Sequence, residues 1–291
     1  MNRPRPSSSS LFALLALFLL LEAPAPAARA GRAPLGSGVL EIDVRSKFSH
    51  VRVRRRGSVR SLIFVRNNGV EAVETVMDVR RPHVLLVPYT QVMFASYLFQ
   101  PDPRRVAVVG LGGGAMVRFL RHHEPELVVD AVEIDPVVVK IAAEQFGTRP
   151  DDKLTITTAD GLEYLKATDV RYDVIYLDAF LKPSAETDAT GVPLRLKTEQ
   201  FYGGLKGKLS PGGVVVVNLN QHPRVAGDLE TLRAAFRQTH VFRVSTTNVV
   251  VVASPSEQRE PLSALRSRAR ELDRRFRANF SFAAMLRLLD R

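Results

Sequence analysis

After residue 38, short apolar segments alternate with polar residues in the way that favours half-buried β-strands. The segments fall at residues 40–44, 51–53, 62–65 and 70–76. Asn68-Gly69, between the last two segments, is typical of a two-residue hairpin turn. This part of the chain is therefore predicted to form a small antiparallel sheet. Arg52, Arg54 and Arg56, at alternate positions, are expected to lie on its solvated face.

Residues 88–98 carry apolar side chains at helical spacing and predict a helix that packs between the small sheet and the next domain. Pro101-Asp102-Pro103 ends this helix, because proline neither continues a helix nor donates a backbone hydrogen bond. We therefore expect a first domain at residues 39–100, made of the β-sheet and the linking helix.

The next 150 residues alternate regularly between apolar strands and amphipathic helices, which is typical of an α/β fold with a parallel sheet. The predicted strands are residues 106–109, 127–132, 154–158, 172–177 and 214–219, with helices between them. The last two strands, 241–245 and 249–253, have no room for a helix between them and should pair antiparallel. Residues 101–255 are thus predicted to be a Rossmann-like domain with a mostly parallel, seven-stranded sheet.

The two ends of the chain differ from this pattern. Residues 1–30 resemble a signal peptide, with arginines before an apolar block at residues 11–21 and Ala28-Arg29-Ala30 as the cleavage site. We expect an exported protein, periplasmic or secreted, with a flexible leader at residues 31–38. An uncleaved membrane anchor is the alternative, although the apolar block is too short to span a bilayer.

Residues 256–291 form an arginine-rich segment with an apolar stripe at Leu262, Leu265, Ala269, Leu272 and Phe276. This spacing predicts a terminal helix that docks on the body of the protein. A helix that lies on a membrane surface or binds an acidic partner is the alternative.

The amino-acid composition excludes several kinds of functional site. The chain has no cysteine, which excludes disulfides, thiolate nucleophiles and cysteine metal sites. Its six histidines show no H-E-x-x-H spacing, so we expect no metal. The formal net charge of +11 could attract anions, but the arginines are spread through the whole chain, and no specific nucleic-acid partner is expected.

Informative residues follow four of the predicted parallel strands, where an open α/β sheet binds its ligands. A glycine turn follows the first strand, Glu133 lies 23 residues after Gly110, and Asp178 ends a later strand. Carboxylates here can accept hydrogen bonds from ribose hydroxyls and from the amine of a purine. Asp135 and Asp160 could instead simply cap helices. The predicted nucleoside-binding residues are Gly110, Gly112, Gly114, Glu133, Ile134, Asp160 and Gly161.

Several of these segments together resemble the spermidine synthase (polyamine aminopropyltransferase) family. The resemblance extends over residues 39–253 and rests on segments 46–53, 110–114, 132–135, 159–161, 172–175 and 198–202. It implies a class I methyltransferase-type fold that binds S-adenosylmethionine or its decarboxylated form as co-substrate. It also implies Glu133 on the ribose, Asp160 near the adenine, Asp178 and Tyr89 at the reacting groups, and a homodimer.

The chain departs from the family pattern at the acidic positions. The family has an aspartate directly after the glycines of the turn, where this chain has Ala115, and a second aspartate three residues after Asp178, where it has Leu181. An acceptor amine with a pKa near 10 must lose a proton before it can attack, so a base is needed. Glu186 or Asp188 is our hypothesis for that base.

The sequence therefore predicts a spermidine-synthase-like transferase that moves an aminopropyl or methyl group to a small acceptor such as a polyamine, with Asp178 and Tyr89 as catalytic residues. A methyltransferase proper and a non-catalytic exported nucleoside-binding module are the alternatives. A nicotinamide-dependent dehydrogenase would explain Gly110-x-Gly112-x-x-Ala115, but neither Asp160-Gly161 nor the antiparallel end of the sheet.

Overall fold

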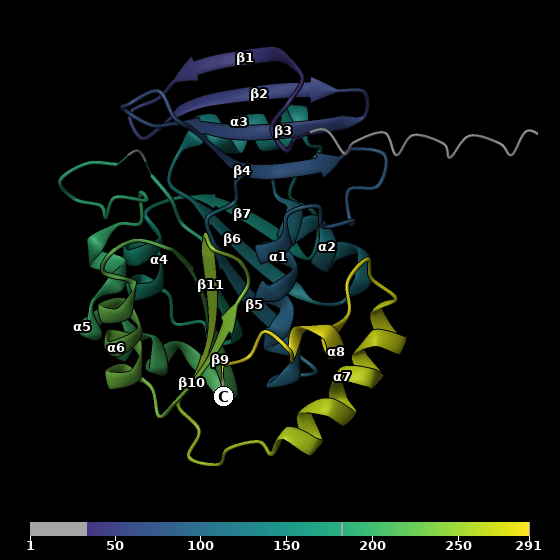
Figure 1. The fold of residues 1–291 in the computed structure, drawn as a ribbon, viewed down its shortest axis with the longest axis vertical. Helices are drawn as coiled ribbons and strands as arrows, with labels where there is room; N and C mark the ends of the chain where they lie inside the picture. Colours follow the sequence, from purple (N-terminus) through teal and green to yellow (C-terminus); the bar gives the residue numbers. More distant parts are fainter. Residues whose placement is uncertain (1–33, 182, 291) are drawn as a thin grey trace, which may run out of the picture. The chain divides into compact units, whose positions relative to one another are not determined.

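In the computed structural model, which describes residues 34–181 and 183–290, the first folded part is a four-stranded antiparallel sheet (Figure 1). Its strands pair in sequence order: β1 (Val39–Arg45), β2 (His50–Arg56), β3 (Val59–Val65) and β4 (Glu71–Asp78). The predicted small antiparallel sheet is confirmed. Arg52 lies on its outer face, where it forms ion pairs with Asp43 and Glu71.

The pairing of β3 with β4 contains one irregularity. Leu62 lies opposite Thr75, but the next residue, Ile63, lies opposite Val73. Glu74 is thus an extra residue on β4, which is the definition of a β-bulge. The alternation of side chains between the two faces of the strand is broken at this point.

The second sheet has seven strands in the order β10-β11-β9-β8-β5-β6-β7. The pairs β9–β11 and β10–β11 are antiparallel, and the other four pairs are parallel. The predicted mostly parallel, seven-stranded α/β fold is therefore confirmed. The strands are β5 (Arg105–Val109), β6 (Val128–Glu133), β7 (Leu154–Thr158), β8 (Tyr172–Leu177), β9 (Leu209–Asn220), β10 (Gln238–Arg243) and β11 (Asn248–Ser254).

Helices cover both faces of this sheet, because successive residues of its buried strands point to opposite faces. Val106 and Val108 of β5 belong to one core, with α1 (Pro88–Met93), the 3₁₀ turn Phe94–Leu98 and α2 (Ala115–His123). Ala107 and Val109 belong to the opposite core. Its helices are α4 (Gly161–Ala167), α5 (Glu199–Leu205) and α6 (Val225–Ala235).

Helix α3 (Pro136–Gln145) connects the two sheets. Its Val138 and Ile141 pack with Phe146 against Val53 and Leu62 of the small sheet. Residues Pro34–Arg291 form one compact unit that contains both sheets, so the small sheet is held at a fixed place beside the larger one. The boundary near residue 101 stays a prediction.

The C-terminal segment corrects the expectation of one terminal helix. It forms two helices, α7 (Leu262–Phe276) and α8 (Phe282–Met285), separated at Arg277, which has a left-handed φ of 45°. The Asp273 carboxylate explains the break, since it accepts hydrogen bonds from the Ser281 hydroxyl (2.8 Å) and the Phe282 amide (2.6 Å). The predicted docking is confirmed, because Leu265, Ala269, Leu272 and Phe276 are buried in the core.

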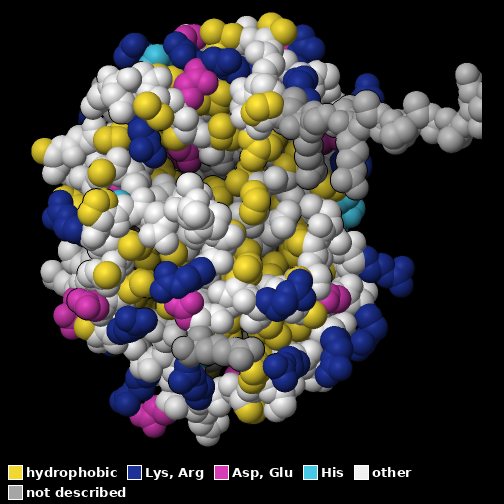
Figure 2. Space-filling view, in the orientation of Figure 1, with side chains coloured by type: hydrophobic (Ala, Val, Ile, Leu, Met, Phe, Trp, Pro, Cys, Tyr) yellow, Lys and Arg dark blue, Asp and Glu magenta, His cyan; other side chains and the backbone are white. Residues whose placement is uncertain are grey.

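The predicted signal peptide and most of the leader fall on residues 1–33, outside the described residues. Among the helices that are described, none combines the length and the hydropathy needed to cross a membrane. On the face shown in Figure 2, the Lys and Arg side chains are scattered, with Asp and Glu side chains among them.

Phe276 is expected to be essential for the attachment of α7. Its ring lies 4.8 Å from that of Tyr97 and 5.3 Å from that of Phe282, centroid to centroid, in the buried core. Phe276→Ala should lower the free energy of unfolding by about 3–5 kcal/mol, measured by chemical denaturation. Leu262→Ala on the same helix is the control, since Leu262 is exposed and should lose little; equal losses would contradict the docking of α7.

Candidate functional site

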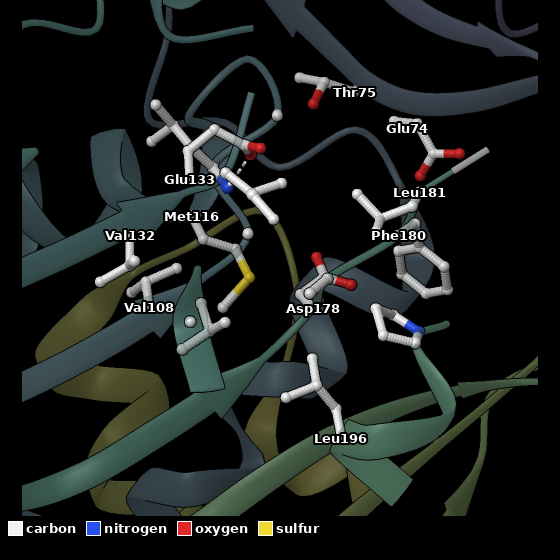
Figure 3. A pocket seen from close by; sticks show the side chains of 18 of the residues that line it. Glu74, Thr75, Val108, Met116, Val132, Glu133, Asp178, Phe180, Leu181 and Leu196 are labelled. Atoms are coloured by element: carbon white, nitrogen blue, oxygen red, sulfur yellow. Dashed lines mark hydrogen bonds between the residues drawn. The ribbon is translucent and has the colours of Figure 1, made fainter. Parts of the chain in front are cut away.

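The carboxyl ends of β5, β6 and β8 surround one pocket, into which the side chains of Glu133, Asp178 and Glu74 project (Figure 3). The structure brings together most of the residues predicted from the sequence. Those that line the pocket are Tyr89, Gly110, Gly112, Glu133, Ile134, Asp160, Gly161 and Asp178. Gly114 does not line it and lies at the start of α2, against Thr148.

The glycine turn depends on close backbone contacts. Gly110 has a φ of +94°, and a Cβ placed on it would collide with the carbonyl group of Asp178. Gly114 has a φ of +81°, and its Cβ would collide with the side chain of Thr148. Only glycine meets both requirements at these positions, namely left-handed backbone and no side chain.

Glu133 holds the glycine turn from the end of β6. One carboxylate oxygen accepts a hydrogen bond from the Leu111 amide and the other from the Asp135 amide, each at 3.0 Å. Burial raises the pKa of Glu133 above its usual range. Each carboxylate oxygen has a second lone pair, so Glu133 can still accept hydrogen bonds from a ligand's hydroxyls.

Asp160 has two partners in this structure. It caps α4 through the Leu162 amide (2.9 Å) and forms an ion pair with Arg195. Asp135 likewise caps α3 through the Val137 amide. The pocket encloses only about 70 Å³. An adenosyl group therefore does not fit in this pocket without some rearrangement of the residues that line it, among which Arg195 and Asp160 form an ion pair.

Asp178 is held on both sides. The Asn218 amide donates to one carboxylate oxygen (2.8 Å), and the Tyr89 hydroxyl donates to the other (3.2 Å). Asn248 in turn donates to Asn218 (3.1 Å), which fixes the orientation of that amide. Burial raises the pKa of Asp178 to about 6, although the two hydrogen bonds oppose the shift.

Asn218 and Glu74 are site residues that the sequence analysis missed. Asn218 was detectable as a polar residue near the end of the apolar strand β9. Glu74 gave no such signal, since only the bulge turns it toward the pocket. Burial, together with the negative charge of Asp178, raises the pKa of Glu74 to about 8, and Arg66 opposes this shift.

The two acids proposed as the base, Glu186 and Asp188, do not line the pocket. Glu186 is exposed. Asp188 accepts hydrogen bonds from Lys197 (2.7 Å) and from the Thr190 hydroxyl (2.7 Å). The structure therefore brings neither residue to Asp178.

Asp188, His222 and Asp228 offer ligand atoms within 4.8 Å of one another, which is spacing suited to a metal ion. The ammonium group of Lys197 lies among them: it forms ion pairs with both carboxylates and is 3.2 Å from His222 Nε2. This ammonium supplies the compensating positive charge from within the chain. The cluster anchors the segment after Asp178 to the first turn of α6.

Comparison with known proteins accounts for this arrangement. Residues 88–256 match the model of the spermine/spermidine synthase domain. The chain belongs to the spermine/spermidine synthase family. A relative in this family, the polyamine aminopropyltransferase of Chromobacterium violaceum, is 33% identical over 237 residues, which cover 79% of this chain and 86% of that protein.

Two solved structures extend the comparison. Human methyltransferase-like protein 13, solved in complex with SAH, is 27% identical, with a TM-score of 0.61; the match covers 67% of this chain and 95% of that one. A probable spermidine synthase from Corynebacterium glutamicum shares the fold, with a TM-score of 0.65 and 20% identity over 80% of this chain and 86% of that one. The proteins to which this chain is similar are thus aminopropyltransferases and methyltransferases, which supports alkyl transfer by this chain.

Glu133→Ala should weaken binding of methylthioadenosine by about 100-fold. Two ribose hydroxyls that each lose a charged acceptor cost about 1.5 kcal/mol apiece, or about 3 kcal/mol together. Isothermal titration calorimetry measures the affinity, and thermal unfolding shows whether the variant stays folded. The control is Glu163→Ala on α4, an exposed residue that pairs with Lys166. Unchanged affinity in folded Glu133→Ala would show that the ribose assignment is wrong.

Proposed function

We propose that this chain transfers an aminopropyl group from decarboxylated S-adenosylmethionine to a small primary amine. The observation that carries the proposal is the position of Asp178, a buried carboxylate held by Asn218 and Tyr89 directly beside the glycine turn. A negative charge at this point favours the cationic groups of the donor and of the acceptor.

The donor half of the site is built from the glycine turn and Glu133. Gly110, Leu111 and Gly112 of the turn line the pocket, and the N-terminus of α2 follows the turn. Glu133 accepts the ribose hydroxyls, and Asp160 faces the adenine once Arg195 has moved. The complex of the human relative with SAH supports an adenosyl ligand in this family's fold.

The reaction is a direct displacement, in which the protein aligns the two reactants and forms no covalent bond with either. The nitrogen lone pair of the acceptor attacks the carbon next to the sulfonium. The carbon–sulfur bond breaks, and its electron pair stays on sulfur, which becomes a neutral thioether. Alignment of the two reactants at contact distance can supply roughly 7–11 kcal/mol of the barrier. Asp178 and Tyr89 fix that alignment.

Methyl transfer from S-adenosylmethionine is the second candidate, and one observation favours it. Ala115 stands where the resemblance to aminopropyltransferases places an aspartate, so the chain lacks one of the acids that would hold the ammonium of an aminopropyl chain. A methyltransferase relative also covers 67% of this chain.

The donor is identified by calorimetry of the protein with S-adenosylmethionine, its decarboxylated form and methylthioadenosine. We expect the decarboxylated donor to bind most tightly and to react with primary amines, and the mass gained by the acceptor distinguishes aminopropyl from methyl. Binding of none of the three would refute both transferase proposals. Binding without any turnover would support the nucleoside-binding module instead.

We also propose export by a cleaved signal peptide, and assembly as a homodimer. The sequence of residues 1–30 supports export. Mass spectrometry of the protein from its native host should then find Gly31 as the first residue. An intact Met1 in the membrane fraction would favour the uncleaved anchor, and light scattering decides the oligomeric state.

A further inference from the structure

An open groove of about 570 Å³ adjoins the pocket around Glu133 and Asp178, which is the proposed donor pocket. Glu74, Val87, Tyr89 and Phe180 line both, so they form the boundary between the two spaces. Seven of the 17 residues that line the groove lie within residues 218–221 and 245–248 and carry neutral side chains that can form hydrogen bonds: Asn218, Asn220, Gln221, Ser245, Thr246, Thr247 and Asn248. A molecule lying in this groove would contact Tyr89 and Asn218, the two residues that hold Asp178.

The β-bulge in β4 places a carboxylate at the inner end of the groove. In a regular strand, Glu74 and Thr75 would point to opposite faces of the sheet. Here both consecutive side chains line the donor pocket, because Glu74 is the extra residue. Thr75 supports the glycine turn by accepting a hydrogen bond from the Gly113 amide (2.9 Å), and Glu74 faces the boundary with the groove (Figure 3).

The carboxylate of Glu74 is placed to receive a cation. Among the described residues, none donates a hydrogen bond to the Glu74 carboxylate. The Tyr89 hydroxyl donates instead to Asp178 and to the backbone carbonyl of Glu74. Asp178 adds a second negative charge nearby. An ammonium between the two carboxylates would relieve their mutual repulsion.

The charged residues that line the groove balance each other. Glu74 is the only acidic residue among the described residues that line the groove, and Arg66 is the only basic one. A second ammonium on the acceptor would meet amides, hydroxyls and the guanidinium of Arg66. The second ammonium and the Arg66 guanidinium would repel each other, because both are positively charged. A neutral or anionic group in the same place would gain hydrogen bonds.

We propose that this groove is the acceptor site, that it takes a primary monoamine whose far end is neutral or anionic, and that Glu74 binds the amine and removes its proton. This proposal rests on the proposed alkyl transfer. The acceptor ammonium gives one proton to the Glu74 carboxylate, and the freed nitrogen attacks the carbon next to sulfur. After the carbon–sulfur bond breaks, protonated Glu74 releases its proton to water.

A matched set of acceptors tests the preference of the groove. 4-Aminobutanol, 4-aminobutanoate and 1,4-diaminobutane share a four-carbon chain and differ in the charge of the far end. We expect kcat/KM for the alcohol and the carboxylate to exceed that for the diamine by about tenfold or more. Preference for the diamine, or donor binding with no reaction of either monoamine, would overturn the proposal. A protein that binds no adenosyl donor would instead refute the proposed function.

Arg66→Gln removes the repulsive charge. This variant should raise kcat/KM for 1,4-diaminobutane relative to 4-aminobutanol, because the second ammonium no longer meets a guanidinium. An unchanged ratio in a protein that still binds the donor would contradict the role given to Arg66.

Glu74→Gln should lower kcat by about 100-fold and leave donor affinity unchanged, because the amide cannot accept the proton. Glu186→Gln is the control, since Glu186 is exposed and lies outside the pocket. Equal kcat in the wild type and Glu74→Gln would overturn the assignment of the base.

The pH profile gives an independent readout. Glu74 acts as a base only when ionised, and its pKa is raised to about 8, so the wild-type rate should rise as the pH increases through this value. The charged and titratable groups around it are Asp178, Tyr89, Arg66 and His50. This rise should be absent in Glu74→Gln, and a rise of the same size in the variant would assign it to another group.

Discussion

The site depends on the close packing of two backbone segments, the glycine turn after β5 and the start of the loop after β8. The Asp178 amide donates to the Val109 carbonyl (2.9 Å), and Gly110 lies against the Asp178 carbonyl where no side chain would fit. The glycine turn and Asp178, which we propose to bind the donor and to lie at the reacting groups, are therefore one rigid unit. Glu133 and Asn218 hold this unit from the strands on either side.

The two sheets have separate tasks in this arrangement. The seven-stranded sheet provides the glycine turn, Glu133, Asp160 and Asp178 at the carboxyl ends of its strands, whereas the four-stranded sheet provides Glu74. The hydrogen bond between Thr75 and Gly113 joins the two parts at the pocket itself. The packing of α3 on the small sheet keeps this junction in register.

The sequence predicted the elements with strong periodicity and the residues that follow parallel strands, because both follow from local spacing. It therefore placed Gly110, Glu133 and Asp178 correctly at the edge of one sheet. It could not predict the turn at Arg277, which depends on hydrogen bonds made by Asp273. It also missed Glu74, because an irregular register between two strands has no marker in the residues of either strand.

The irregular register in β4 affects how such an enzyme can diverge. Loss of one residue from this strand would restore regular alternation and turn a neighbouring side chain toward the pocket in place of Glu74. The seven-stranded sheet would be unaffected by the change. Single-residue insertions and deletions in β4, rather than substitutions, are thus a route by which a fold of this kind can gain or lose an acid while its donor pocket is inherited intact.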